Sequence, residues 1–220
     1  MAAAGPDTYR GRMTHRRTEV TTLDQLRAIV SDPVPRVRDK VRRELTDVHV
    51  EWLAAARLYF VATSDAEGNL DVSPKGDPAG SVLVLDPVTV ALPDRPGNRR
   101  VDGFRNMLQD SHIAVEFVIP GRGDTLRING TATILSDAPY AERFAVDGRL
   151  PQLITEIAID EVFFHCSKAF LRSRAWDPDG WDGDAVPRRA VIAKALERPE
   201  DSLEELDRYY GEAYERQQLY

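Results

Sequence analysis

Closely spaced runs of β-forming residues fill the middle of the chain, and they constrain its fold more than any other feature. LYFVATSD, LDVSPKG, SVLVLD and VTVALPD lie between residues 58 and 94, separated by turn formers such as Glu67-Gly68-Asn69. HIAVEFVIP and DTLRINGTATIL follow, and the tight PGRG turn between them predicts a hairpin. LITEIAIDEVFFHC supplies a last long strand. Because helical patterns do not alternate with these runs, they predict an antiparallel barrel of six or seven strands.

Helical patterns flank the strands on both sides. Thr22 and Gln25 have the spacing of a capping box, and apolar residues recur behind them at the helical period. PRVRDKVRREL and VHVEWLAAAR predict two further helices before the first strand. The tail SLEELDRYYGEAYERQQLY opens with the same capping-box spacing, which predicts a terminal helix.

Composition and charge exclude several classes of protein. The chain of 220 residues is 42% hydrophobic and 30% charged, as ordinary soluble globular proteins are. Its formal net charge of −7 argues against a general nucleic-acid binder, which needs a broadly basic face, but leaves room for a small basic pocket. The single cysteine, Cys166, excludes an internal disulfide and a cysteine-cluster metal site. No apolar run approaches the roughly 18 residues of a membrane span, and no signal peptide is evident, so we expect a cytoplasmic protein.

An arginine-rich turn in LPDRPGNRRVDGFRNML stands out in this acidic chain. Asn98 is a candidate N-cap, which would place Arg99 and Arg100 in the first turn of a helix. The inward stripe of that helix would be Val101, Phe104 and Leu108, with Met107 beside it. Cations are unfavourable at a helix N-terminus, because its free backbone N–H groups carry partial positive charge. Either nearby aspartates neutralise a solvated turn, or a bound phosphate resolves the conflict.

Two other segments add polar groups that a phosphate ligand could use. DVSPKGD supplies Ser73 and Lys75 on an irregular strand, and HCSKAFLRSRAW supplies further cations, with an ordinary basic helix face as the alternative for the second segment. The sequence lacks the motifs of nucleotide-binding loops, zinc proteases and serine hydrolases. It therefore identifies no catalytic residue and no metal ligand.

Four motifs in this order resemble the pyridoxamine 5′-phosphate oxidase-like flavoproteins, and more closely a bacterial subgroup defined by its FMN-binding split barrel. The motifs are DVSPKGD, PDRPGNRRVDGFRNM, IPGRGDTLRINGTA and FFHCSKAFLRSRAWDP. The resemblance covers roughly residues 20–178 and implies a mainly β fold, a six-stranded antiparallel split barrel with flanking helices. It also implies a homodimer that binds two FMN molecules between its subunits.

The resemblance divides the chain into four parts. We expect a flexible N-terminus over residues 1–18 and N-terminal helices over 19–57. The FMN-binding barrel would cover 58–178, and a loop with C-terminal helices packing on the barrel would cover 179–220.

The same resemblance implies a set of FMN-binding residues. The turn would hold the phosphate, the strand of DVSPKGD would run beside the flavin ring and ribityl chain, a later strand would face the partner's flavin, and the last segment would complete the flavin or substrate pocket. In chain order these residues are Ser73, Pro74, Lys75, Arg95, Asn98, Arg99, Arg100, Arg127, Lys168, Arg172 and Trp176.

The chain departs from the true oxidase in two places. The Arg-x-His element that holds the phosphorylated vitamin is absent, and PYAERFAVDGRL does not match the oxidase's Arg-Pro-containing segment. We therefore do not expect oxidation of pyridoxamine phosphate.

The leading hypothesis is an FMN-dependent oxidoreductase acting on an unidentified small organic substrate, with NAD(P)H as a candidate electron donor. The alternatives are a non-catalytic flavin- or haem-binding protein and a deazaflavin-dependent reductase. A nucleic-acid-binding barrel is the least favoured, and we expect neither a nucleic acid nor a membrane as a partner.

Overall fold

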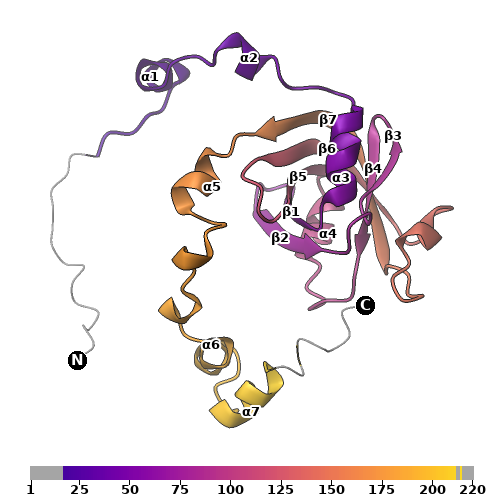
Figure 1. Cartoon of the computed structure of the whole chain (residues 1–220), viewed down its shortest axis with the longest axis vertical. Helices are drawn as coiled ribbons and strands as arrows, with labels where there is room; N and C mark the ends of the chain where they lie inside the picture. Colours follow the sequence, from indigo (N-terminus) through magenta and orange to yellow (C-terminus); the bar gives the residue numbers. More distant parts are fainter. Residues whose placement is uncertain (1–16, 212–213, 215–220) are drawn as a thin grey trace. The chain divides into compact units, whose positions relative to one another are not determined.

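The computed structural model describes residues 17–211 and residue 214 (Figure 1). The predicted flexible segment, residues 1–18, lies almost wholly outside the described residues. The chain divides into two units, residues 1–40 and residues 41–220.

The described part of the first unit contains two short helices. α1 (Leu23–Ile29) begins where predicted, because Thr22 Oγ1 accepts the backbone N–H of Gln25 at 3.2 Å. The second predicted helix is shortened to α2 (Pro35–Arg38). Downstream, in the other unit, Arg42 pairs as an isolated β-bridge with Val162, and this extended pairing replaces the helix expected there.

The described part of the second unit contains a sheet of seven antiparallel strands, which confirms the predicted antiparallel barrel class. The strands are β1 (Leu58–Ser64), β2 (Leu70–Gly76), β3 (Leu83–Asp86), β4 (Thr89–Asp94), β5 (His112–Val118), β6 (Thr125–Leu135) and β7 (Leu153–His165). Their order is β2-β1-β5-β6-β7-β4-β3 (Figure 1). The count is seven rather than six, because the short run at β3 forms an edge strand of its own beside β4. The predicted hairpin is confirmed as β5 and β6.

Side-chain ion pairs connect β2, the first strand in this order, with β4, the last but one. Lys75 Nζ of β2 lies 2.7 Å from Asp94 Oδ1 of β4. Just beyond these strands, Arg95 Nη2 lies 2.7 Å from Asp77 Oδ2 and donates to the carbonyl oxygen of Phe144. The Arg95 and Asp77 side chains are only 9% and 2% exposed. A buried ion pair therefore joins the two sides of the barrel where the backbone ladder does not.

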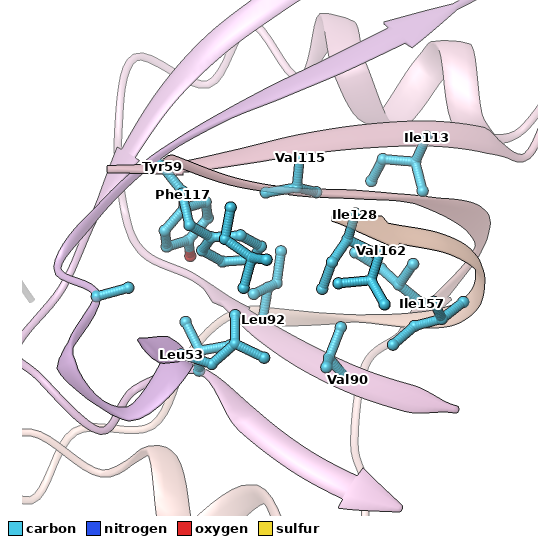
Figure 2. Close-up of a cluster of buried hydrophobic side chains, with 14 of the residues drawn as sticks. Leu53, Tyr59, Val90, Leu92, Ile113, Val115, Phe117, Ile128, Ile157 and Val162 are labelled. Atoms are coloured by element: carbon cyan, nitrogen blue, oxygen red, sulfur yellow. The ribbon is translucent and has the colours of Figure 1, made fainter. Parts of the chain in front are cut away.

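The main core fills the space enclosed by the strands and α3 (Asp47–Ala55). Figure 2 shows Leu53 of α3 gathered with side chains that the strands contribute, among them Leu92, Phe117 and Val162. A smaller cluster forms where η1 (Ala141–Phe144) packs against β3, β4 and β7. The alternating apolar positions of the strands thus supply most of the main core and part of the smaller cluster.

A glycine at a bulge permits the long β6–β7 pairing. The register shifts between Asn129 and Gly130, and Asp160 is the extra residue on β7. A Cβ on Gly130 would overlap the carbonyl oxygen of Ala158 and lie 2.9 Å from Ile157 Cγ2.

We expect Gly130→Ala to lower the free energy of unfolding by about 3 kcal/mol, since overpacking against backbone cannot relax cheaply. Urea denaturation measures the change. Gly183→Ala is the matched control, because nothing lies within 4 Å of its added Cβ, and it should change stability by less than about 0.5 kcal/mol. Equal stability of the two variants would contradict the role given to Gly130.

A histidine caps the N-terminus of α3. The backbone N–H of Thr46 donates to His49 Nδ1 at 3.0 Å, and the buried ring stacks on Phe164 with centroids 5.4 Å apart. Burial lowers the pKa of His49 below its ordinary value of 6.5, and the positive charge of Arg42 lowers it further. The cap therefore requires a neutral imidazole.

The free energy of unfolding should fall as the pH drops through about 6.5, because the unfolded chain binds this proton more readily than the folded one. Urea denaturation between pH 5 and pH 8 checks this. His49→Gln keeps an acceptor at the capping position but does not titrate, so its stability should depend less on pH over this range. The same pH dependence in both proteins would contradict the assignment to His49.

The C-terminal region is helical. It contains α5 (Lys168–Ser173), η2 (Pro178–Gly180), η3 (Gly183–Ala185), α6 (Arg189–Leu196) and α7 (Leu203–Tyr209). The predicted capping box at Ser202 is confirmed at the start of α7. Buried residues of α6 and α7 form a small cluster of their own, and packing of this region on the barrel stays a prediction. No helix in the described part of the chain is long and apolar enough to cross a membrane.

Candidate functional site

A cleft of about 400 Å³ opens between β2, β4 and the short helix α4 (Asp102–Met107). Its volume lies in the range of small-molecule sites. The apolar part of its lining comprises Tyr59, Val61, Val72, Leu92, Val101, Phe104, Met107 and Ile113. The loop of residues 95–101 forms its polar end. Apolar side chains together with a cationic loop suit a ligand that carries both a ring and an anion.

The arginine loop differs from its predicted conformation. α4 begins at Asp102, and its N-cap is Val101 rather than Asn98. Asn98 Oδ1 instead accepts the backbone N–H of Arg100 at 3.0 Å. Arg99 and Val101 have φ values of 61° and 53°, so the chain is left-handed at both positions and cannot be helical from Arg99 onward. The prediction that Arg99 and Arg100 occupy the first helical turn is therefore wrong.

The predicted inward face of this helix is also wrong in part. Phe104 and Met107 pack inward, but Val101 and Leu108 are 48% and 78% exposed. The helix starts later than predicted and ends at Met107, so Val101 and Leu108 are its caps and lie outside its inward face.

Most cations of the cleft already have an acidic partner. Lys75 pairs with Asp94, and its Nζ lies 5.6 Å from the centre of the Phe104 ring. Arg100 Nε lies 2.6 Å from Asp102 Oδ2, with the Arg100 side chain 73% exposed. Arg99 is exposed and takes part in no ion pair among the described residues. The loop thus offers two guanidinium groups to an anion. That of Arg99 has no acidic partner among the described residues, and that of Arg100 belongs to a solvent-exposed ion pair.

Left-handed backbone at a β-branched residue such as Val101 is rare and strained. Such strained conformations cluster at ligand-binding loops and active sites, where contacts with the surrounding structure hold the backbone in place. The conformation holds Arg99 and Arg100 on the lining of the cleft.

The structure brings seven of the predicted site residues together on the lining of this cleft. They are Ser73, Pro74, Lys75, Arg95, Asn98, Arg99 and Arg100. Arg95 is the most buried of the guanidinium groups there, and its contacts to Asp77 and Phe144 give it a structural role as well.

The other four predicted residues do not line this cleft. The Arg127 guanidinium lies 4.4 Å from the centre of the Phe163 ring. Trp176 Nε1 donates to the carbonyl oxygen of Arg122 at 2.6 Å, and Lys168 and Arg172 lie on α5. Their part in ligand binding stays a prediction.

Sequence reasoning missed several residues that bring polar groups to the cleft, among them Asp71 and, through its hydroxyl, Tyr59. Asp71 alternates with Ser73 and Lys75 on β2, so the period of the strand places it on the same face. Burial raises the pKa of Tyr59 above its ordinary value, and the negative charges of Asp77 and Asp94 raise it further. The Tyr59 hydroxyl therefore stays protonated at neutral pH.

Across the described ranges, no group of three or more His, Cys, Asp or Glu side chains is placed to hold a metal ion.

Comparisons with solved structures find partial similarity to several proteins. HupZ of Group A Streptococcus is 26% identical, with 55% of this chain and 93% of that chain covered and a TM-score of 0.43. A Lactobacillus delbrueckii protein, provisionally described as a pyridoxamine 5′-phosphate oxidase, is 27% identical, with coverages of 56% and 95% and a TM-score of 0.43. General stress protein 26 of Bacillus anthracis is 12% identical, with coverages of 52% and 88% and a TM-score of 0.41. A search of the curated proteins returns no match.

The family model described as pyridoxamine 5′-phosphate oxidase matches residues 45–166. This span runs from the residue before the capping threonine of α3 to the end of β7 and includes the whole cleft loop. It is more than half of the chain. The chain therefore belongs to the pyridoxamine 5′-phosphate oxidase family.

Proposed function

We propose that this protein is an FMN-dependent oxidoreductase that acts on a small organic substrate. The observation that carries the proposal is the cleft itself, because the Arg99–Arg100 loop, polar residues of β2 and apolar side chains line the same space. Arginine guanidinium groups bind a phosphate ester through charge-assisted hydrogen bonds. The donors and the apolar wall fit a phosphorylated ring compound such as FMN.

Each part of the cleft has a distinct task in this proposal. Arg99 and Arg100 hold the phosphate, with Asp102 giving up its ion pair to Arg100 or sharing it. Phe104 and Met107 exclude water from one side of the ring, and Lys75 places positive charge nearby. When bound, the flavin supplies the hydride and electron chemistry, so the protein needs to provide only binding, orientation and electrostatics.

A second subunit would complete the site. In the family resemblance Arg127 faces the partner's flavin, and a later segment completes the flavin or substrate pocket with Lys168, Arg172 and Trp176. None of these four residues lines the cleft of its own chain. Arg127 Nε is buried without a hydrogen-bond partner among the described residues, which fits a group awaiting a partner. A monomeric mass in solution would contradict this part of the proposal.

The purified protein should be yellow and should release FMN on denaturation, identified by mass spectrometry. A colourless protein that also fails to take up added FMN would contradict the proposal. Release of a deazaflavin or of haem would instead support the corresponding alternative.

The second candidate is a flavin-binding protein without turnover. The same cleft supports it, because neither candidate needs a dedicated acid or base from the protein. Photoreduction followed by stopped-flow reoxidation separates the two. Reaction with NAD(P)H or with an organic acceptor faster than free FMN supports the oxidoreductase, and rates equal to free FMN support the binding protein.

A further inference from the structure

Three alternate residues of β2 face the cleft. Asp71, Ser73 and Lys75 are each half-buried and lie on one face of the strand, while the residues between them are exposed, and two of these, Val72 and Pro74, also line the cleft. Ser73 Oγ donates a hydrogen bond to Asp71 Oδ2 at 2.8 Å. Two of the three side chains are therefore joined to each other before any ligand arrives.

Asp71 differs from the other aspartates around the cleft. Asp77, Asp94 and Asp102 each pair with a lysine or arginine, whereas Asp71 takes part in no ion pair in the part of the chain that the structure describes. Its Oδ2 lies 3.4 Å from the point where a Cβ on Gly103 would stand, so the carboxylate packs against the first turn of α4. The hydrogen bond from the Ser73 hydroxyl stabilises this half-buried carboxylate, which has no cationic partner among the described residues.

The direction of this hydrogen bond decides what Ser73 offers to a ligand. A serine hydroxyl has one proton and two acceptor lone pairs. Because the carboxylate accepts the proton, the hydroxyl has only lone pairs left, and donation to an anion makes it a stronger acceptor. Ser73 is thus set to accept from a ligand O–H or N–H group rather than to donate.

We propose that Asp71 is a positioning residue that fixes Ser73 as a hydrogen-bond acceptor, so that the cleft selects ligands with an anion at the arginine loop and an O–H or N–H donor at β2. The inference rests on the proposed function, because FMN carries a phosphate together with hydroxyl and ring N–H donors. It adds to that function a residue that acts on the ligand only through Ser73.

A double-mutant cycle on FMN affinity tests the proposal. Ser73→Ala should weaken binding by roughly fivefold, the loss of one hydrogen bond. Asp71→Asn should weaken binding by a similar factor in the wild-type background and should have no such effect in the Ser73→Ala background. A purely structural or purely electrostatic role of Asp71 would give the same factor in both backgrounds, so the coupling isolates positioning. Asp71→Ala provides a second variant if Asp71→Asn does not fold.

Asp110→Asn is the matched control. Asp110 also accepts from a serine hydroxyl, that of Ser64 at 3.4 Å, but neither residue lines the cleft. FMN affinity of this variant should equal that of the wild type. If wild-type protein does not bind FMN, the proposed function itself fails. If wild-type protein binds FMN but Asp71→Asn changes the affinity by the same factor with and without the Ser73 hydroxyl, or not at all, the positioning role is overturned and the function stands.

Discussion

Replacing Arg99 and Arg100 together by alanine is expected to weaken FMN binding by at least about 100-fold. Each guanidinium can make charge-assisted hydrogen bonds to the phosphate, worth about 1.5–3 kcal/mol apiece, and the double variant loses both sets. Both side chains are exposed, so the free energy of unfolding should change by less than about 0.5 kcal/mol. Quenching of flavin fluorescence on titration measures the affinity.

Arg105→Ala is the matched control for this pair. Arg105 is an exposed arginine of the same segment, on α4, and it does not line the cleft. It should leave the affinity for FMN within about twofold of the wild type, since a distant exposed charge is screened by salt. An equal loss in Arg105→Ala and in the double variant would show that net charge, rather than the loop, sets the affinity.

Asp77→Ala should lower the free energy of unfolding by about 3–5 kcal/mol. The substitution leaves the guanidinium of Arg95, 9% exposed, beside a cavity where its carboxylate partner was. The same ion pair joins the loop after β2 to the loop after β4, so its loss also loosens the cleft. Chemical denaturation followed by far-UV circular dichroism gives the value.

Asp102→Ala removes the solvent-exposed ion pair with Arg100 and is the control for Asp77→Ala. Its partner Arg100 is 73% exposed, so the expected loss is within about 1 kcal/mol. A loss for Asp77→Ala no larger than that of Asp102→Ala would contradict the structural role of the buried pair.

The strands could be predicted from the sequence because their signals are local. Alternation of apolar residues and a tight turn define the β5–β6 hairpin within 24 residues, His112 to Leu135. The closure of the barrel could not be predicted in the same way. It depends on Lys75 meeting Asp94 and Asp77 meeting Arg95, pairs that lie 19 and 18 residues apart with no periodic signal between them.

The conformation of the arginine loop is where local rules failed. Asn98 after a Pro-Gly turn has the chemistry of an N-cap, and valine is a poor choice for left-handed backbone. The structure nevertheless gives Val101 the left-handed conformation and starts the helix after it. Packing of Phe104 and Met107 against the barrel core sets the start of α4, and no feature of the loop alone encodes that packing.

The cleft residues were predicted unevenly for a related reason. A search of the sequence for side chains that could donate hydrogen bonds to a phosphate finds Arg99, Arg100 and Lys75. It does not find Asp71, because a carboxylate near an anion-binding site is electrostatically unfavourable. In the structure the Asp71 carboxylate accepts a hydrogen bond from the Ser73 hydroxyl, so its proposed partner is Ser73 and not the phosphate. The proposed role of Arg127 depends on a second chain, and one sequence contains no signal for the geometry between two subunits.

Titration of the wild-type protein with FMN and with riboflavin, which differ only in the phosphate, tests most directly whether the arginine loop is a phosphate site. FMN should bind at least about 100-fold more tightly, and the difference should vanish in the Arg99→Ala/Arg100→Ala variant. Equal affinities for the two flavins in the wild-type protein would contradict the assignment of this loop.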